Sequence, residues 1–296
     1  MKFKRYTDVD EFQGAVLDVL LENEVENNLP VSILVDCSRE NSKNWLMSTV
    51  TDDNDNILLV AICTKPFNIM LIDVGASGSV AGASGSAGDA QDIQSAVLFL
   101  ADELKHIGFA PPGVIAKAEL AQMFSKAYCG DEINSKHHMS MIIMKLDKLS
   151  DYKKAPGYCR VLCTEDLNFT PFWERDFSIE CKIPVFDVGE YKNRIQTRLG
   201  RNIHYIWVDE VPVAQAVWGR TTPNSAAVSW VFTPPEHRGK GYATSVVAEL
   251  SRSILKSGKT SCCLFADAAN PVSTKIYRSI GYYDVCTVDE IKFDIP

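Results

Sequence analysis

The sequence predicts an α/β (α+β) fold, arranged as two domains that each hold a mixed sheet with helices on both faces. The chain has 296 residues, and chains of this length usually divide into two domains. Strand-like and helix-like periodicities alternate along it. Both halves also repeat the order helix, hairpin, strand, glycine-rich loop, helix, which indicates an internal duplication.

The first half begins with an amphipathic helix at residues 8–24. Its apolar residues recur at helical spacing, and Thr7 stands where an N-terminal cap is useful. A hairpin, a third strand and a second helix are expected to follow. Their ranges are 45–50 and 57–63 for the hairpin strands, 67–74 for the third strand and 92–107 for the helix.

A low-complexity segment rich in glycine and serine, residues 75–88, joins that third strand to the helix. A loop between a strand and a helix can cradle phosphate. This one contains no Lys or Arg and has no fixed glycine spacing, so we expect a flexible connection instead.

The polar stretch 146–157 ends in Pro-Gly and predicts a linker, so we place two domains at 1–150 and 151–296. The second domain shows the same alternation as the first. Its expected strands are 158–164, 203–208, 211–218, 226–232 and 261–266, and its expected helices are 172–180, 188–199, 242–256 and one that starts at Pro271.

A basic glycine loop follows the strand 226–232 and leads directly into the helix 242–256. The N–H groups and the dipole at a helix N-terminus favour a phosphate. Gly239 and Gly241 would let the backbone approach an anion closely, and Arg238 and Lys240 supply positive charge. The loop lacks the glycine spacing and terminal Lys-Ser/Thr of a nucleotide P-loop.

The run Arg238-Gly239-Lys240-Gly241-Tyr242-Ala243 resembles the signature (Gln/Arg)-x-x-Gly-x-(Gly/Ala) of the GNAT superfamily of acyl-CoA-dependent N-acetyltransferases. Downstream, the segment from Asn270 to Tyr282 is similar to a second signature of that family, in the expected order and separation. Together the two signatures cover about the last 70 residues.

The resemblance implies that the loop grips the pyrophosphate of coenzyme A. It also implies that the strand containing Trp230 binds the pantetheine arm through its backbone, with a bulge that aims an N–H at the thioester oxygen. The cofactor-binding residues expected on this basis are Val231, Phe232, Thr233, Arg238, Gly239, Lys240, Gly241, Tyr242, Ala243, Thr244 and Asn270.

The family mechanism implied is direct attack of an amine on the thioester, without a covalent enzyme intermediate. In this family the tyrosine equivalent to Tyr277 commonly protonates the departing thiolate. The base is harder to assign, because the strand before the loop offers Ser229 but no carboxylate. Asp267 is the better-placed candidate, although an Asp there usually caps a turn. We interpret Glu236 as a solvated surface charge.

The composition and net charge of the chain limit the classes of binding partner that we expect. The formal charge of −8 argues against broad binding to nucleic acid or to an anionic membrane. The first residues lack the apolar run of a signal peptide, so we expect a cytoplasmic protein. The 9 cysteines include no CxxC pair, and we predict buried thiols and no metal site. Cys159 and Cys163 are expected to share one face of a strand.

The leading hypothesis is therefore an N-acetyltransferase that uses acetyl-CoA on a small-molecule or peptide amine, including a protein lysine or N-terminus. The alternative is a non-catalytic acyl-CoA-binding sensor or regulatory module, which the missing strand carboxylate favours. The first domain lacks the basic loop and is expected to be a degenerate copy or an accessory domain that does not bind CoA at that loop.

Overall fold

The computed structural model describes residues 1–74 and 87–295. The chain forms two compact units. The N-terminal unit comprises Met1–Ile142 together with Cys286–Pro296, and the C-terminal unit comprises Ile143–Val285. The last residues thus belong to the N-terminal unit, whereas the sequence placed them in the second domain. The predicted loop 75–88 lies almost wholly outside the described residues.

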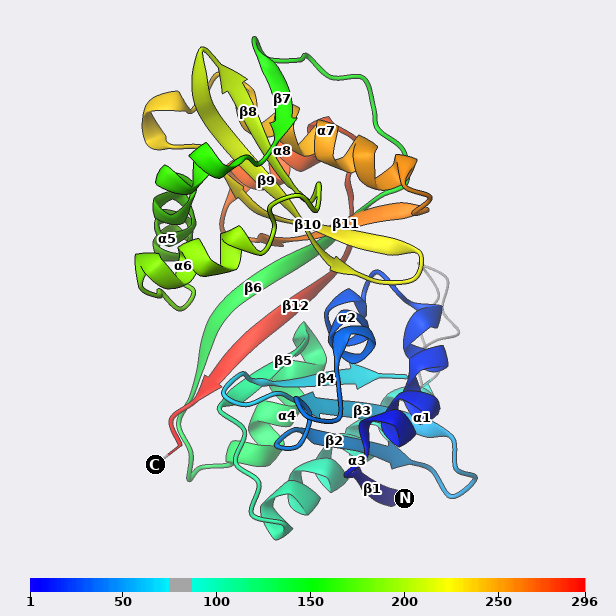
Figure 1. Ribbon diagram of the computed structural model, residues 1–296. Helices are drawn as coiled ribbons and strands as arrows, with labels where there is room; N and C mark the ends of the chain where they lie inside the picture. The colour runs from blue at the N-terminus through cyan, green and yellow to red at the C-terminus, as the bar shows by residue number, and fades with distance from the viewer. Residues whose placement is uncertain (75–86, 296) are drawn as a thin grey trace. The chain divides into compact units, whose positions relative to one another are not determined.

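The N-terminal unit is a sheet with helices on both faces (Figure 1). Its strand order is β1-β2-β3-β4-β5-β12, and all neighbouring pairs are antiparallel except β4 and β5. The elements are β1 (Lys2–Tyr6), α1 (Val9–Glu22), α2 (Asn28–Asp36), β2 (Leu46–Thr51), β3 (Ile57–Cys63), β4 (Ile69–Asp73), α3 (Ala87–His106), β5 (Gly113–Lys117), α4 (Ala118–Cys129) and β12 (Tyr283–Phe293).

Successive side chains of a strand point to opposite faces of the sheet, which explains why helices pack on both faces. Val60 and Ile62 of β3 pack with the apolar faces of α1 and α2, whereas Leu59, Ala61 and Cys63 pack with α3 and α4. Strands that are buried on both faces read as continuous apolar runs, as β3 does. Helix α1 is capped by Asp8, whose carboxylate accepts from the N–H groups of the next turn, so Thr7 is not the cap.

The C-terminal unit repeats this plan with the strand order β6-β11-β10-β9-β8-β7, to which β6 contributes its last residues, from Ile143 onward. Its elements are β6 (Ser135–Leu146), β7 (Tyr158–Val161), α5 (Thr170–Glu180), α6 (Val188–Gln196), β8 (His204–Asp209), β9 (Val211–Thr221), β10 (Ser225–Phe232), α7 (Tyr242–Lys256), β11 (Ser261–Asp267) and α8 (Pro271–Ser279). Two 3-10 turns, Thr164–Asn168 and Pro235–His237, are added. Each unit thus runs strand, two helices, three strands, helix, strand, helix.

Helices cover both faces of this second sheet as well (Figure 1). The Tyr205 hydroxyl on β8 bonds Ser253 of α7 at 2.6 Å, whereas its neighbour Ile206 packs with Tyr191 and Ile195 of α6. The predicted fold class is therefore confirmed. Strand β7 ends at Val161, so Cys159 and Cys163 do not share a strand as predicted.

Strands β6 and β12 each cross a division between the units. Strand β6 begins before residue 142 and ends after it, and β12 does the same at residue 285. No helix in the described ranges is both long and apolar enough to cross a membrane.

Candidate functional site

Strands β10 and β11 run parallel but pair along a short part of their lengths. Ser225–Ala227 pairs with Ser261–Cys263. Strand β10 continues to Phe232 and β11 to Asp267, and over these described positions the two strands form no further ladder pairs with each other. Towards their carboxyl ends, the described parts of β10 and β11 therefore do not hydrogen-bond to each other in a ladder. Open α/β sheets bind ligands at the carboxyl ends of their strands.

A β-bulge interrupts the other edge of β10 at the same level. Ser229 pairs with Val217 and Phe232 with Gln215, so Trp230 and Val231 lie opposite a single residue of β9. Trp230 adopts a φ of 51°, in the left-handed region that bulky side chains rarely enter. The bulge that the resemblance implied is present.

The glycine loop follows β10 through a short 3-10 turn. Gly239 and Gly241 have φ values of 79° and 83°, and Gly241 is the N-cap of α7. A Cβ atom placed at Gly239 would have no heavy atom of the described residues, other than its chain neighbours, within 4 Å, so the loop is open on that side. The first N–H groups of α7 have no intrahelical acceptor, so this loop can present donors to an anion.

The two cations of the loop differ in their environment. Arg238 is exposed and bonds Glu180 at the end of α5 through two contacts of 2.7 and 2.9 Å, and it also donates to the Thr233 carbonyl. Lys240 is exposed. Arg238 would therefore have to exchange Glu180 for a phosphate in order to bind one.

Among the other predicted cofactor residues, Tyr242 points away from the loop. Its side chain is buried, and its hydroxyl donates to Asp209 at the turn between β8 and β9, which raises the pKa of the phenol. It can contribute to an anion site only through its backbone N–H. Ala243 and Thr244 are half-buried in the first turn of α7.

Asn270 is the N-cap of α8, and Asp267 closes the turn that joins β11 to this helix. The Asn270 side chain accepts from Ser273 N at 3.2 Å, and Asp267 Oδ1 accepts from Ala269 N at 2.8 Å. Both residues are exposed. Asp267 thus caps a turn, as an Asp at this position usually does, and this bond occupies one of its two carboxylate oxygens.

Tyr277 is buried on α8 and lies edge-on to Tyr282 at a centroid distance of 6.0 Å. Burial, together with the nearby Cys181 thiol, raises the pKa of Tyr277 well above its usual 10.0. The phenol is therefore protonated at neutral pH and can donate its proton. Gly281 follows the C-cap residue of α8 with a φ of 107°, a backbone conformation that favours glycine after a helix.

Cys181 connects α5 to this group. Burial raises the pKa of its thiol to about 11, with smaller contributions from Glu180 and Asp267. The thiol at the end of α5 thus interacts electrostatically with Asp267 at the end of β11 and with Tyr277 on α8. No sequence motif includes Cys181, so this relation could not be read from the sequence.

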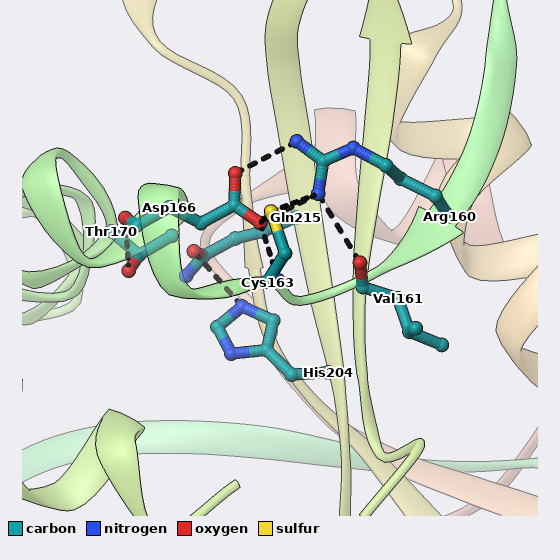
Figure 2. Close-up of polar contacts among 7 residues, drawn as sticks. All are labelled: Arg160, Val161, Cys163, Asp166, Thr170, His204 and Gln215. Atoms are coloured by element: carbon teal, nitrogen blue, oxygen red, sulfur yellow. Dashed lines mark hydrogen bonds and ion pairs between the residues drawn. The ribbon is translucent and has the colours of Figure 1, made fainter. Parts of the chain in front are cut away.

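A buried polar cluster that the sequence analysis missed lies beside the bulge (Figure 2). Asp166 is 1% exposed and accepts two bonds from Arg160 at 2.6 and 2.8 Å. Burial raises the pKa of this carboxyl, but the bonds from Arg160 and from Cys163 N outweigh it, so the pKa lies below its usual value. This pair fixes the chain between β7 and α5.

His204 and Gln215, also in Figure 2, form the second part of the cluster. Both are fully buried, on β8 and β9, and His204 Nε2 lies 3.3 Å from Gln215 Oε1. Burial and the nearby Arg198 lower the pKa of His204 to about 3. The sequence contained one indication of this cluster: His204 and Gln215 are polar residues within otherwise apolar strands. No group of His, Cys, Asp and Glu in the described structure could hold a metal ion.

Comparisons with known proteins agree with this geometry. Residues 208–289 match the family model described as FR47-like protein. The GCN5-related N-acetyltransferase from Sphaerobacter thermophilus matches with a TM-score of 0.61 and 14% identity, over 99% of this chain and 96% of its own. A GNAT-family acetyltransferase from Colwellia psychrerythraea matches with a TM-score of 0.58 and 12% identity, over 99% and 100%.

A tandem GNAT protein from the clavulanic acid biosynthesis pathway also matches over the whole chain. Its TM-score is 0.55 at 12% identity, covering 100% of this chain and 99% of that protein. No curated protein matches this sequence. At these identities the likeness establishes the fold, so the GNAT fold expected from the two signatures is confirmed.

Proposed function

We propose that this chain is an N-acetyltransferase that moves an acetyl group from acetyl-CoA to a primary amine of a small molecule or peptide. The amine attacks the thioester carbonyl directly in a ternary complex. One observation carries the proposal: the bulge at Trp230 lies on the strand that leads into a glycine loop at the N-terminus of α7, beside the unpaired ends of β10 and β11.

The residues present suit coenzyme A. The N–H groups at the start of α7, with Lys240 beside them, would bind the pyrophosphate. Gly239 leaves room for it, because its missing side chain would meet nothing within 4 Å. The backbone from Val231 to Thr233 would bind the pantetheine arm, and Asn270 would lie near the cofactor.

Tyr277 is the proposed general acid. When the amine nitrogen bonds the carbonyl carbon and the carbon–sulfur bond breaks, the thiolate needs a proton, which the protonated Tyr277 hydroxyl can supply. The attacking ammonium must lose a proton, and we propose Asp267 as its acceptor. Asp267 ends β11, and its charge affects the Cys181 thiol that also affects Tyr277.

Calorimetric titration with acetyl-CoA tests the cofactor site. We expect wild type to bind one equivalent and Gly241→Asp to weaken binding at least about 100-fold, or roughly 3 kcal/mol, because it places a negative charge among the donors. Gly258→Asp is the matched control. It adds the same charge at a glycine with a φ of 100°, after the other end of α7. Equal binding by both variants would overturn the loop assignment.

The alternative is a non-catalytic acyl-CoA-binding module. It is favoured by the absence of a carboxylate on the described β10 and by the turn bond that already occupies one oxygen of Asp267. Release of free CoA thiol from acetyl-CoA in the presence of a panel of amines separates the two. Binding without amine-dependent release across the panel would favour the alternative.

A further inference from the structure

We propose that Gln215, supported by His204, is a positioning residue that fixes the Trp230–Val231 peptide so that the Val231 N–H faces the reacting thioester. This inference rests on the proposed function. It concerns the same site, but it names residues that neither signature contains.

The location of Gln215 is the first observation. It pairs with Phe232 across the bulge and is fully buried on β9. Its side-chain Nε2 donates to the Trp230 carbonyl at 3.4 Å. Gln215 therefore bonds the bulge at the residue whose backbone is in the left-handed region.

The direction of the hydrogen bonds is the second observation. The Gln215 amide oxygen can only accept, so His204 Nε2 must carry the proton of the 3.3 Å contact. With a pKa lowered to about 3, His204 is neutral and carries one N–H. The chain thus runs from the His204 N–H through the Gln215 amide to the Trp230 carbonyl, and each group donates to the next.

Peptide geometry gives the consequence at Val231. The Trp230–Val231 peptide is not among the cis bonds of the described chain, and in a trans peptide the C=O and the following N–H point in opposite directions. A carbonyl held toward the side-chain amide of Gln215 leaves the Val231 N–H pointing away from that amide. We infer that this N–H is the donor to the thioester oxygen, at the edge of β10 that β11 leaves unpaired.

The surroundings of Trp230 support a fixed bulge. Phe177 and Tyr191 pack against the indole at centroid distances of 5.0 and 6.4 Å, and the Arg198 guanidinium lies 5.9 Å from it. These contacts hold the side chain, whereas Gln215 holds the peptide. A donor on the carbonyl also polarises the peptide and makes its N–H a stronger donor.

The test uses the full chain and acetyl-CoA labelled with carbon-13 at the thioester carbonyl. For wild type we expect the infrared carbonyl stretch to move to lower frequency on binding, because a donor at the oxygen weakens the C=O bond. In Gln215→Leu this shift should be lost while calorimetric affinity is kept. With an accepted amine, kcat should fall about 10- to 100-fold at unchanged KM, at or below the cost of deleting an oxyanion donor.

Tyr205→Phe is the matched control. It removes a hydrogen bond from the strand residue next to His204, but that bond goes to Ser253 of α7 and not to the bulge. It should keep the carbonyl shift and kcat. Gln215→Glu provides a second variant in case Gln215→Leu fails to fold. Its carboxyl can donate when protonated, so its carbonyl shift should be present at low pH and lost as pH rises.

The outcomes separate this inference from the proposed function. Failure of wild type to bind acetyl-CoA would overturn the proposed function and, with it, this inference. Binding with a carbonyl shift that survives in Gln215→Leu, and that does not depend on pH in Gln215→Glu, would overturn the inference alone.

Discussion

The two units of this chain share one order of elements and differ where a cofactor would bind. In the N-terminal unit, β3 and β4 pair without interruption from Leu59 with Asp73 to Cys63 with Ile69. In the C-terminal unit, the corresponding β9 and β10 are broken by the bulge at Trp230. A regular ladder uses its backbone groups internally, whereas a bulge frees and redirects one of them.

The ends of the parallel strands differ as well. Strands β4 and β5 pair at Ile69 and Met70, and beyond this pairing Lys117 at the end of β5 lies 3.5 Å from Asp73 at the end of β4. Lys117 also bonds Glu26 at 3.0 Å. An ion pair thus bridges the two strand ends in the N-terminal unit. In the described residues, the bulge, the basic loop and strand ends without a bridging ion pair therefore distinguish the C-terminal unit from the N-terminal one, and these are the features on which the proposed cofactor site depends.

The largest effect is expected at Tyr277, seven residues after the N-cap of α8. The residue seven after the N-cap of α4 is Phe124, which is buried and has no hydroxyl. Tyr277→Phe should therefore lower kcat about 100-fold, within the range for general acids, and leave acetyl-CoA affinity unchanged. Steady-state rates together with calorimetry measure this.

The pH profile sharpens that prediction. Burial raises the pKa of Tyr277 above 10.0, so the acid stays protonated and wild type should show no alkaline loss from this group below that pH. Tyr282→Phe is the control, because it removes the neighbouring buried hydroxyl, which bonds Ser251. Equal rates for Tyr277→Phe and wild type would remove Tyr277 from the mechanism.

A smaller effect on stability is expected from opening the ion pair of the N-terminal unit. Lys117→Ala leaves Asp73 and Glu26 without their cation. The Lys117 side chain is 41% exposed, so we expect a loss of about 1–2 kcal/mol in the free energy of unfolding, less than for a fully buried pair. Urea denaturation measures it, with Lys2→Ala of the exposed pair to Asp55 as a control that should change little.

The sign of its pH dependence follows from Asp73. Burial raises the pKa of this carboxyl, and Lys117 lowers it in part. Without Lys117 the pKa rises further, so the ionised form costs stability once pH rises through the folded pKa. The deficit of Lys117→Ala should shrink as pH falls toward and below the usual value of 3.8. A deficit that does not depend on pH would contradict a role for Asp73.

The smallest expected effect is a change in acetyl-CoA affinity when Arg238 of the glycine loop is released from Glu180. Glu180→Gln removes the carboxylate that holds Arg238 and should strengthen acetyl-CoA binding about 2- to 5-fold, the range of an exposed ion pair. Glu236→Gln is the control, since it changes net charge equally beside the same loop. Titrations at one ionic strength measure both, and equal changes would indicate that net charge alone acts.

Strong periodicity made much of the fold predictable. Helix 242–256 and strand 57–63 were predicted with the bounds that the structure has. The elements without a predicted range were β1, α2, β5, α4, β6 and β12. Three of these are short, α2 contains Pro30, and β6 begins with the exposed polar residues from Ser135 to His138. Helix α4 is different, because its buried residues Leu120, Phe124 and Tyr128 recur at helical spacing, so its pattern could have been recognised in the sequence.

The site was predictable to the extent that it is local in sequence. The loop from Arg238 to Gly241 and the start of α8 follow from motifs in which neighbours act together. Cys181, His204 and Gln215 take their positions from contacts between distant elements, so no spacing predicts them. The bonds of Arg238 to Glu180 and of Tyr242 to Asp209 were missed for the same reason.

The two strands that cross between the units limit how this chain can be divided. A fragment beginning at residue 151 would lack β6, the neighbour of β11, and would retain β12, whose residues from Val288 to Lys292 pair with β5 of the discarded half. It would have one bare sheet edge and one strand without its partner, and both favour aggregation. Each half of the sequence therefore supplies a strand to the sheet formed mostly by the other half, so neither half alone contains every strand of its own sheet.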